Sequence, residues 1–393
     1  MWAALFLLTA LVVLLPLLPA ILEWRFPSDV VPLHIDSQDA LDPPFLAHSF
    51  KVRLDEAVAQ GQPRLGKSHL AETPTTGAWR FIERERRSHA SRRVWQSTGD
   101  ITLPAEMTYL GEVAAQGSLR TAPNEVYRGL WAGERLNLAN CATLLRWAHG
   151  RTVDVHSGCQ LAGRVSAEER ITLWGPATFL LLHAPVVCFN TDPVRAQMAS
   201  SRPLPVLQAG LPEPVLWNDI AQRGTCDEPL EILGGTAWQG DLVCRADLVM
   251  GPRCTTDGSL KVHGDLEAAA GCQLTGNAVV EGRIELGPNC IVGGSLLSET
   301  EIVLGAGCVV GAPGRLATVA APRVRVAPGV VVHGTIWASD IGRTQGYGVA
   351  DELPRRRFAG AAGRPDLGFE EWAETQIDPR PGQRPPRLYK AAA

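Results

Sequence analysis

Several features that mark common functional classes are scarce or missing in this chain of 393 residues. The net charge is −4, so no overall basic field favours binding to nucleic acid. The nine cysteines include no CxxC pair, which argues against a thiol zinc site, and their odd number argues against a disulfide framework. Aromatic residues make up only 6%, whereas 39 glycines and 29 prolines predict many turns. This composition favours an all-β chain of short strands, with length enough for two or three domains.

The first 22 residues contain no charged side chain. The stretch from Trp2 to Leu22 is long enough to cross a hydrocarbon core of about 30 Å. Trp2 and Trp24 stand where interfacial aromatic side chains are found. A cleaved signal peptide would need a basic start and a small-residue cleavage site, and the segment has neither. We therefore expect an N-terminal transmembrane helix over 1–22.

The orientation of this expected span depends on few residues. Arg25 is the basic residue nearest to the span and follows it, which favours a body in the cytoplasm. Unpaired thiols also suit a reducing compartment. We therefore expect a single-pass membrane protein with a cytoplasmic body, and a periplasmic body is the alternative.

An 18-residue period runs through the second half of the chain. Rows of 18 that start at Leu230 repeat an aliphatic residue in column one and glycine in column eleven. Three strands with their corners fill 18 positions, so equivalent residues stack about 4.8 Å apart in a parallel β-helix. Free cysteine is a small apolar side chain that suits a narrow core, and glycine suits corners with unusual φ angles. Column seven is the expected core ladder, Cys254, Cys272, Cys290, Cys308 and Val330.

A fainter form of the same period precedes this block, and in it Cys141 and Cys159 are again 18 residues apart. Between the two blocks lies a proline-rich stretch, which is unusually long for a loop inside a domain. Whether the two blocks form one continuous rod is left open by the sequence. The expected organisation is an anchor over 1–22, a membrane-proximal region of unclear fold over 23–100, a first β-helix block over 101–188, a Pro-rich insertion or linker over 189–229, a second block over 230–341 and a disordered tail over 342–393.

Short units of apolar-x-x-x-Gly-[Asp/Ser/Asn/Thr]-apolar recur in the second block, as TAWQGDLVC, CTTDGSLKV, CQLTGNAVV, CIVGGSLLS and VVVHGTIWA. In these units the region 230–341 resembles bactofilins, a family of bacterial polymer-forming cytoskeletal proteins. The resemblance implies a right-handed triangular β-helix without catalysis or cofactor. It also implies end-to-end joining into filaments near the bacterial inner membrane. The expected span, the region over 23–100 and the upstream block depart from the common pattern of the family.

The last row, VRVAPGVVVHGTIWASDI, is among the most apolar rows in the chain. An open solenoid end exposes unpaired backbone groups, and most solenoids cover such an end with a cap. We therefore expect this row to pair with another copy or with a related bactofilin, so that Val331→Asp or Ile336→Lys would abolish assembly and leave the monomer folded. The expected assembly edge comprises Val330, Val331, Val332, Ile336 and Trp337.

A hexapeptide-repeat acyltransferase is the alternative function. IELGPNCIVGGS and IVLGAGCVVG also read as hexapeptides, and that family forms a left-handed β-helix with the same 18-residue turn. Such an enzyme needs a histidine base, and no loop of CoA-adapted basic composition accompanies the candidates. We expect no catalytic residue, cofactor or metal site, because collinear thiols do not surround an ion tetrahedrally. The candidate bases are His149, His156, His183, His263 and His333, of which the last two are expected at exposed corners.

Two further segments are candidates for contacts outside the β-helix. The segment RFIERERRSHASRR is either a solvated charged stretch or a contact for anionic lipid headgroups. The segment GFEEWAETQ in the tail is a candidate helix for an unidentified protein partner. The possible lipid contacts are Arg80, Arg84, Arg86, Arg87, Arg92 and Arg93.

Overall fold

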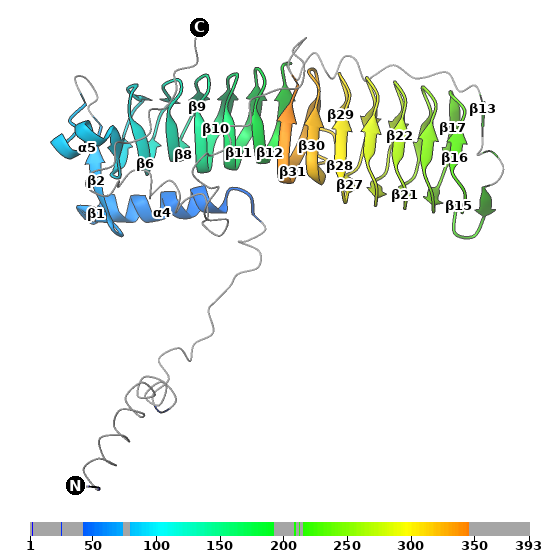
Figure 1. The fold of residues 1–393 in the computed structure, drawn as a ribbon, viewed down its shortest axis with the longest axis horizontal. Helices are drawn as coiled ribbons and strands as arrows, with labels where there is room; N and C mark the ends of the chain where they lie inside the picture. The colour runs from blue at the N-terminus through cyan, green and yellow to red at the C-terminus, as the bar shows by residue number, and fades with distance from the viewer. Residues whose placement is uncertain are drawn as a thin grey trace. The chain divides into compact units, whose positions relative to one another are not determined.

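The structure is a computed structural model (Figure 1) that describes Trp2, Arg25 and residues 42–73, 79–191, 208–209, 212 and 215–345. The chain divides into two compact units, Met1–Asp42 and Pro43–Ala393. The first unit lies almost wholly outside the described residues, so the fold below is that of the second unit. This unit is a β-solenoid of about 13 turns, which confirms the expected all-β parallel β-helix.

The first block of the solenoid begins well before residue 101. Its strands are preceded by one longer helix, α4 (Phe45–Ala59), and interrupted by a short one, α5 (Glu83–Ser88). The strands are β1 (Arg64–Leu65), β2 (Ser68–Glu72), β3 (Ala90–Ser91), β4 (Val94–Ser97), β5 (Ile101–Thr102), β6 (Thr108–Ala115), β7 (Leu119–Arg120), β8 (Val126–Ala132), β9 (Arg135–Leu138), β10 (Thr143–Val155), β11 (Gln160–Leu173) and β12 (Thr178–Phe189).

The second block consists of shorter strands, most of them two to four residues long. They are β13 (Gln208–Ala209), β14 (Leu216–Asn218), β15 (Arg223–Cys226), β16 (Leu230–Ile232), β17 (Thr236–Gln239), β18 (Asp241–Cys244), β19 (Leu248–Met250), β20 (Thr255–Asp257), β21 (Leu260–Val262), β22 (Leu266–Ala268), β23 (Gln273–Leu274), β24 (Ala278–Val280), β25 (Ile284–Leu286), β26 (Ile291–Val292), β27 (Leu296–Ser298), β28 (Glu301–Leu304), β29 (Val309–Val310), β30 (Ala317–Val326) and β31 (Val331–Thr344).

The register of the second block follows the sequence period residue by residue. Leu248 pairs with Leu266, Leu266 with Ile284, and Ile284 with Ile302, always in parallel strands one turn apart. All four side chains are buried, because alternate residues of a strand point into the coil. The repeating aliphatic column is therefore the core of this block.

The first block is less regular because its long strands bend around a corner of the coil. The register of β10 on β11 shifts between Gly150 and Thr152, so the preceding part of the turn is one residue shorter than 18. A bulge of this kind bends a strand and interrupts a fixed period. As a consequence Cys141 lies beside Gly158 instead of Cys159, and it is exposed while Cys159 is buried.

The first turns of the first block are closed by aromatic side chains. Trp79 and Phe81 stack at a centroid distance of 5.7 Å, and each packs edge-on against the buried Trp95. Below them Tyr109 and Tyr127 stack at 5.6 Å inside the coil. These rings cover the apolar cross-section that an open solenoid end would expose.

The two blocks are joined within the chain at their C-terminal ends. Strand β12 pairs antiparallel with β31, and the two strands lie side by side in Figure 1. The register sets Leu182 opposite Ile336 and Phe179 opposite Gly342. A Cβ at position 342 would lie 2.1 Å from the Phe179 ring, so glycine is required for this close approach. One sheet therefore continues from the first block into the second.

This junction corrects the expectation of an open assembly edge. Val331 and Val332 pair with Cys188 and Val187 of β12, and both valines are buried. Val330 and Ile336 are fully buried, and only Trp337 of the expected set is exposed, at 54%. Within the described residues the row that was expected to meet another copy is covered by the first block of its own chain.

The expected transmembrane helix over 1–22, and with it the single-pass location in the bacterial inner membrane, is not upheld. Among the described residues no helix combines the length and the apolar character needed to span a membrane. Residues 1–22 lie outside the described part of the chain apart from Trp2, and the tail segment GFEEWAETQ lies outside it as well.

Candidate binding surface

The cysteine column is an internal structural feature of the second block. Cys254, Cys272, Cys290 and Cys308 have no exposed surface. Each thiol donates to a backbone carbonyl of the preceding turn at 3.1–3.2 Å, as Cys272 does to the oxygen of Gly251. Contact with the neighbouring thiol of Cys272 and burial raise the pKa of Cys254. The column thus combines small apolar volume with a weak donor, and burial keeps these thiols from acting as nucleophiles.

The corner glycines of column eleven have two different causes. Gly240 and Gly334 adopt φ angles of +97° and +128°, which other residues resist. At Gly276 the cause is space, because a Cβ would lie 2.3 Å from the carbonyl oxygen of Gly258. Successive turns therefore approach too closely at this corner for any side chain.

The polar residue after each corner glycine forms a second ladder on the outside. Asp241 accepts from the backbone N–H of Ser259 at 2.9 Å, and Ser259 accepts from that of Asn277 at 3.2 Å. Asn277 accepts from the N–H of Ser295, which accepts from that of Thr318. This chain of hydrogen bonds explains the Gly-[Asp/Ser/Asn/Thr] units, because each short polar side chain satisfies a donor of the next turn.

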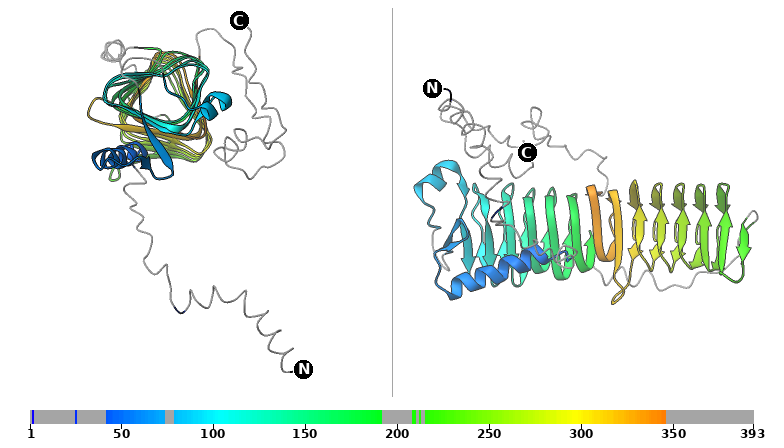
Figure 2. Two further views of the ribbon diagram at one scale, coloured as in Figure 1. Left: turned by 90° about the vertical axis from the view of Figure 1, so that its left-hand side faces the viewer. Right: turned by 90° about the horizontal axis from the view of Figure 1, so that it is seen from below.

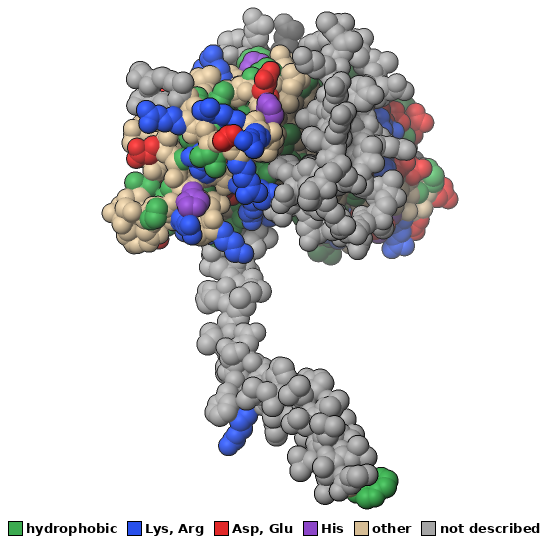
Figure 3. Space-filling view, turned by 60° about the vertical axis from the view of Figure 1, so that its left-hand side comes forward, with side chains coloured by type: hydrophobic (Ala, Val, Ile, Leu, Met, Phe, Trp, Pro, Cys, Tyr) green, Lys and Arg blue, Asp and Glu red, His purple; other side chains and the backbone are tan. Residues whose placement is uncertain are grey.

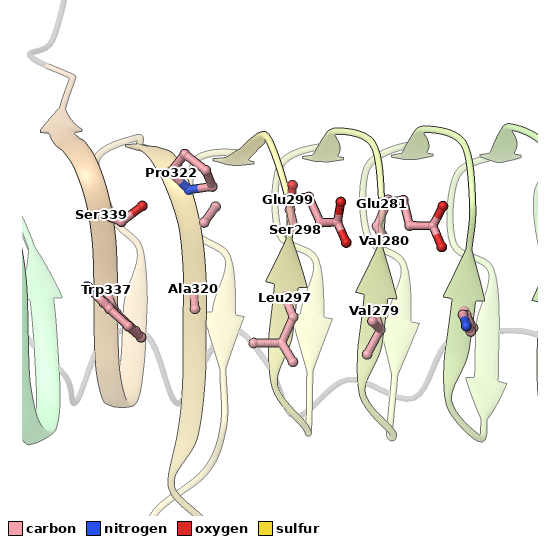
Figure 4. Close-up of a pocket in the computed structure, with 12 residues that line it drawn as sticks. Val279, Val280, Glu281, Leu297, Ser298, Glu299, Ala320, Pro322, Trp337 and Ser339 are labelled. Carbon is pink, nitrogen blue, oxygen red and sulfur yellow. The ribbon is translucent and has the colours of Figure 1, made fainter. Parts of the chain in front are cut away.

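Two positions further along each strand lies an apolar outward column. Val279 is paired with Leu297, Leu297 with Ala320, and Ala320 with Trp337. Trp337, Val279 and Leu297 are 54%, 40% and 38% exposed, and Figure 4 shows the three side chains in one row across the strands. Together with Lys261, Pro322 and their neighbours they line a groove of about 440 Å³. We call these apolar residues, Val279, Leu297, Ala320 and Trp337, the lateral stripe.

In the first block the same column is covered by a helix. The register continues from Trp337 through Leu181 and Arg164 to Trp147. Trp147 is only 3% exposed because Phe50 of α4 packs against it at a ring distance of 5.2 Å. Figure 2 shows α4 lying on the outside of the coil, along its length.

The contact of α4 with the solenoid is a small core of its own. It combines one side of an amphipathic helix with outward residues of the sheet, and Lys51 adds a cation–π contact over Trp131 at 4.7 Å. The cluster contains Ala47, Phe50 and Leu54 of the helix with Val94, Ala114 and Trp147 of the coil.

One side of the lateral stripe is acidic. Glu281 and Glu299 follow the stripe residues by two positions on β24 and β27, and Figure 4 shows both carboxylates along the same side of the row. Glu281 is paired with His263 at 2.7 Å, whereas Glu299 makes no ion pair with any described residue. The other side is the uncharged hydrogen-bonded ladder of Asn277 and Ser295.

The candidate histidine bases do not converge on one cleft. His149 and His183 lie in one row near α4, hydrogen-bonded to Ser166 at 2.9 Å and Thr335 at 2.8 Å. His333 was expected at an exposed corner, but it is 2% exposed and contacts the carbonyl oxygen of Pro185. His263 is half-buried in its ion pair with Glu281, and His156 is also half-buried.

His149 has a neighbourhood that superficially resembles a catalytic triad. Ser166 lies 2.9 Å from Nδ1, and a Glu168 oxygen lies 3.9 Å from Nε2. Ser166 is only 3% exposed, however, and the ring of His48 packs against His149 at 4.9 Å. Burial, and then the neighbouring His48, lower the pKa of His149 to about 4. This neutral histidine serves the packing of α4, because a substrate cannot reach a hydroxyl buried in this way.

The arginine-rich segment divides into a structural and an exposed part. Arg93 pairs with the buried Glu85 and lies 5.0 Å from the Trp95 ring, so it helps to hold α5 on the solenoid. Arg87 pairs with Glu83 on the surface of α5. Figure 3 shows basic side chains gathered over this end of the rod. The exposed members of the expected set are Arg80, Arg84, Arg86, Arg87 and Arg92.

A buried carboxylate near the last turns was missed by sequence reasoning. Glu301 is 6% exposed and is surrounded by Arg283, Arg323 and Arg325, with N–O distances of 3.3, 3.7 and 2.9 Å. Arg323 follows the insertion in the period, which displaced it from its column in the sequence rows. Within the described residues, no cluster of three His, Cys, Asp or Glu side chains is placed to hold a metal ion.

The lateral stripe was also missed, although its signal was present in the sequence. Column fourteen of the 18-residue rows contains Val279, Leu297 and Trp337 at a position that points outward. Outward columns of a solvated solenoid are expected to be polar, so a run of apolar residues there indicates a binding surface. Comparison of the chain with protein-family models, curated proteins and solved structures finds no match.

Proposed function

We propose that this protein is a non-enzymatic scaffold, a rigid β-solenoid rod that binds other proteins along its side. The observation that carries the proposal is the antiparallel junction of β12 with β31. It occupies the edge through which a solenoid of this kind would extend, so the exposed apolar surface near it is lateral.

The resemblance to bactofilins supports a structural role and adjusts how that role is fulfilled. The family resemblance implies β-helices that join end to end between copies. In this chain two β-helical blocks make such a joint with each other, through Leu182 opposite Ile336 and their neighbours. The proposed scaffold is therefore a rod of defined length in place of a long filament.

The acyltransferase receives no comparable support from a specific contact. An enzyme of that type needs an accessible base beside a cleft. The histidines that face the lateral groove or the junction are instead paired, as His263 is with Glu281, or buried, as His149 and His333 are. We therefore retain the scaffold as the single proposed function.

Negative-stain electron microscopy together with analytical ultracentrifugation of the purified full chain tests this proposal. About 13 turns at a spacing of about 4.8 Å give a rod of about 60 Å, and separate rods of that length are expected. Long filaments would contradict a defined length. A side-by-side trimer that binds acyl-CoA would contradict the scaffold and favour the enzyme.

A further inference from the structure

We propose that the lateral stripe is the docking site of an amphipathic α-helix from a partner protein, with basic residues along one flank of that helix. The proposal deepens the scaffold function and rests on it for the premise that the side of the rod binds proteins. The stripe comprises Val279, Leu297, Ala320 and Trp337, in register across four strands.

The first argument is continuity with a helix interface that the molecule already has. The stripe and Trp147 belong to one outward column, and α4 covers that column in the first block. Phe50 and Leu54 show how such a helix packs, with apolar residues about one turn apart that contact successive strands. Beyond Trp337 the column remains apolar, yet its residues are exposed.

The second argument is spacing. Neighbouring strands of the solenoid are about 4.8 Å apart, and residues i and i+3 or i+4 of a helix lie about 5–6 Å apart. A helix that crosses the strands can therefore place one apolar residue over each member of the stripe. From Val279 to Trp337 the stripe spans three strand intervals, about 14 Å, which corresponds to about three helical turns.

The third argument is shape and charge. The stripe lies in a groove of about 440 Å³, which fits a convex helix better than the flat face of a second rod. Glu281 and Glu299 border the groove on one side, and hydrogen-bonded Asn277 and Ser295 border it on the other. A partner helix with Lys or Arg facing the two carboxylates matches this asymmetry.

A labelled synthetic peptide tests the proposal by fluorescence anisotropy with the purified full chain. The probe is the α4 sequence Phe45–Ala59 with Asp55→Lys and Glu56→Lys, which keeps the packing residues and adds basic charge. We expect binding to the wild-type chain and a loss of at least about tenfold in affinity for Leu297→Asp. Glu299→Lys is expected to weaken the basic peptide by about threefold to tenfold and to weaken the unmodified α4 peptide less.

Val249→Asp is the matched control, because Val249 is 39% exposed at mid-strand on β19, outside the stripe. Its binding is expected to equal that of the wild type. Absence of binding up to about 1 mM, or binding that Leu297→Asp leaves unchanged, contradicts the proposal. The second result would mean that the peptide replaces α4 at its own site.

Two further outcomes identify other occupants and also overturn the proposal. Sedimentation of the wild type as a dimer that Leu297→Asp dissociates would assign the stripe to a second copy. Binding that appears only after the chain is cleaved at a protease site inserted after Gln345 would assign it to residues 346–393. Failure of the docking site leaves separate rods intact in electron micrographs, whereas failure of the scaffold function shows filaments or an acyl-CoA-binding trimer.

Discussion

The two blocks of the solenoid reach the same architecture by different means. The second block repeats residue by residue, with strands of two to four residues and a column of buried cysteines. The first block uses strands of 12 to 14 residues that bend at bulges, and its core contains stacked Tyr109 and Tyr127. Its outer face is covered by α4, whereas the equivalent column of the second block is bare.

This difference shows that regularity and coverage are linked. Identical turns stack without adjustment, so the second block needs no helix to hold its face. In the first block large outward side chains such as Trp147 would be exposed without α4. The apolar residues of the bare face, such as Trp337, therefore need another explanation than the stability of the coil.

The largest expected effect concerns the junction that joins the blocks. Ile336→Lys places a charge at a fully buried position opposite Leu182, and it is expected to cost about 4 kcal/mol of unfolding free energy. Trp337→Lys, one residue further and 54% exposed, is the matched control, with an expected cost below about 1 kcal/mol. Chemical denaturation followed by circular dichroism measures both, and equal costs would contradict the buried junction.

The next effect separates the covered face from the bare one. Leu54→Ala removes a buried side chain of α4 and is expected to cost about 3 kcal/mol, at first as release of the helix. Val52→Ala changes an exposed residue of the same helix and is expected to cost little. Hydrogen exchange of the α4 amides is the measurement, and unchanged protection in Leu54→Ala would show that the contact holds nothing.

Acidification should loosen the first block and spare the second. The pKa of His149 in the folded chain is lowered to about 4 by burial and by His48, so the folded chain binds its proton less readily than the unfolded chain. Stability from this residue is present above about pH 6.5 and is lost as the pH falls toward 4, by up to about 3 kcal/mol.

The test of this pH dependence is a comparison with His149→Gln. The variant is expected to flatten the fall in stability between pH 6.5 and 4, measured by denaturation at each pH. An equally steep fall in His149→Gln would assign the pH dependence to other groups.

The smallest effects concern the cysteines. Cys290→Ala removes a buried thiol and its hydrogen bond to the Ala269 carbonyl, at an expected cost of about 1 kcal/mol. Cys141→Ala should be neutral because Cys141 is exposed. Alkylation of the native protein, followed by mass spectrometry, should modify Cys141 first, and rapid modification of Cys290 would contradict the buried column.

The sequence alone predicted the second block because its period is a direct record of its register. The column of Cys254, Cys272 and Cys290 and its aliphatic partners could be read from spacing. The bulge at Gly150 and Thr152 changed the length of a turn in the first block, so the apparent pairing of Cys141 with Cys159 was wrong. Local irregularities of this kind leave no period to follow.

The site was harder to predict because it depends on contacts between distant segments. The pairing of β12 with β31 joins residues about 150 positions apart, and neither strand carries a local signal for its partner. The apolar residues of β31 were correctly identified as an edge that needs covering, but the sequence could not say that the cover is the first block. The outward column with Leu297 and Trp337 was visible and became meaningful only beside α4.

The most direct test of the account is a disulfide across the junction. His183 and Thr335 are directly opposite in the antiparallel pair, with their side chains hydrogen-bonded at 2.8 Å. The double variant His183→Cys, Thr335→Cys is expected to form an intramolecular disulfide, which mass spectrometry of the non-reduced digest detects. The control pair His183→Cys, Thr318→Cys, one strand further apart, should not form one. A disulfide within the monomer is the predicted result, and a disulfide between two copies, or none, would contradict the single continuous rod.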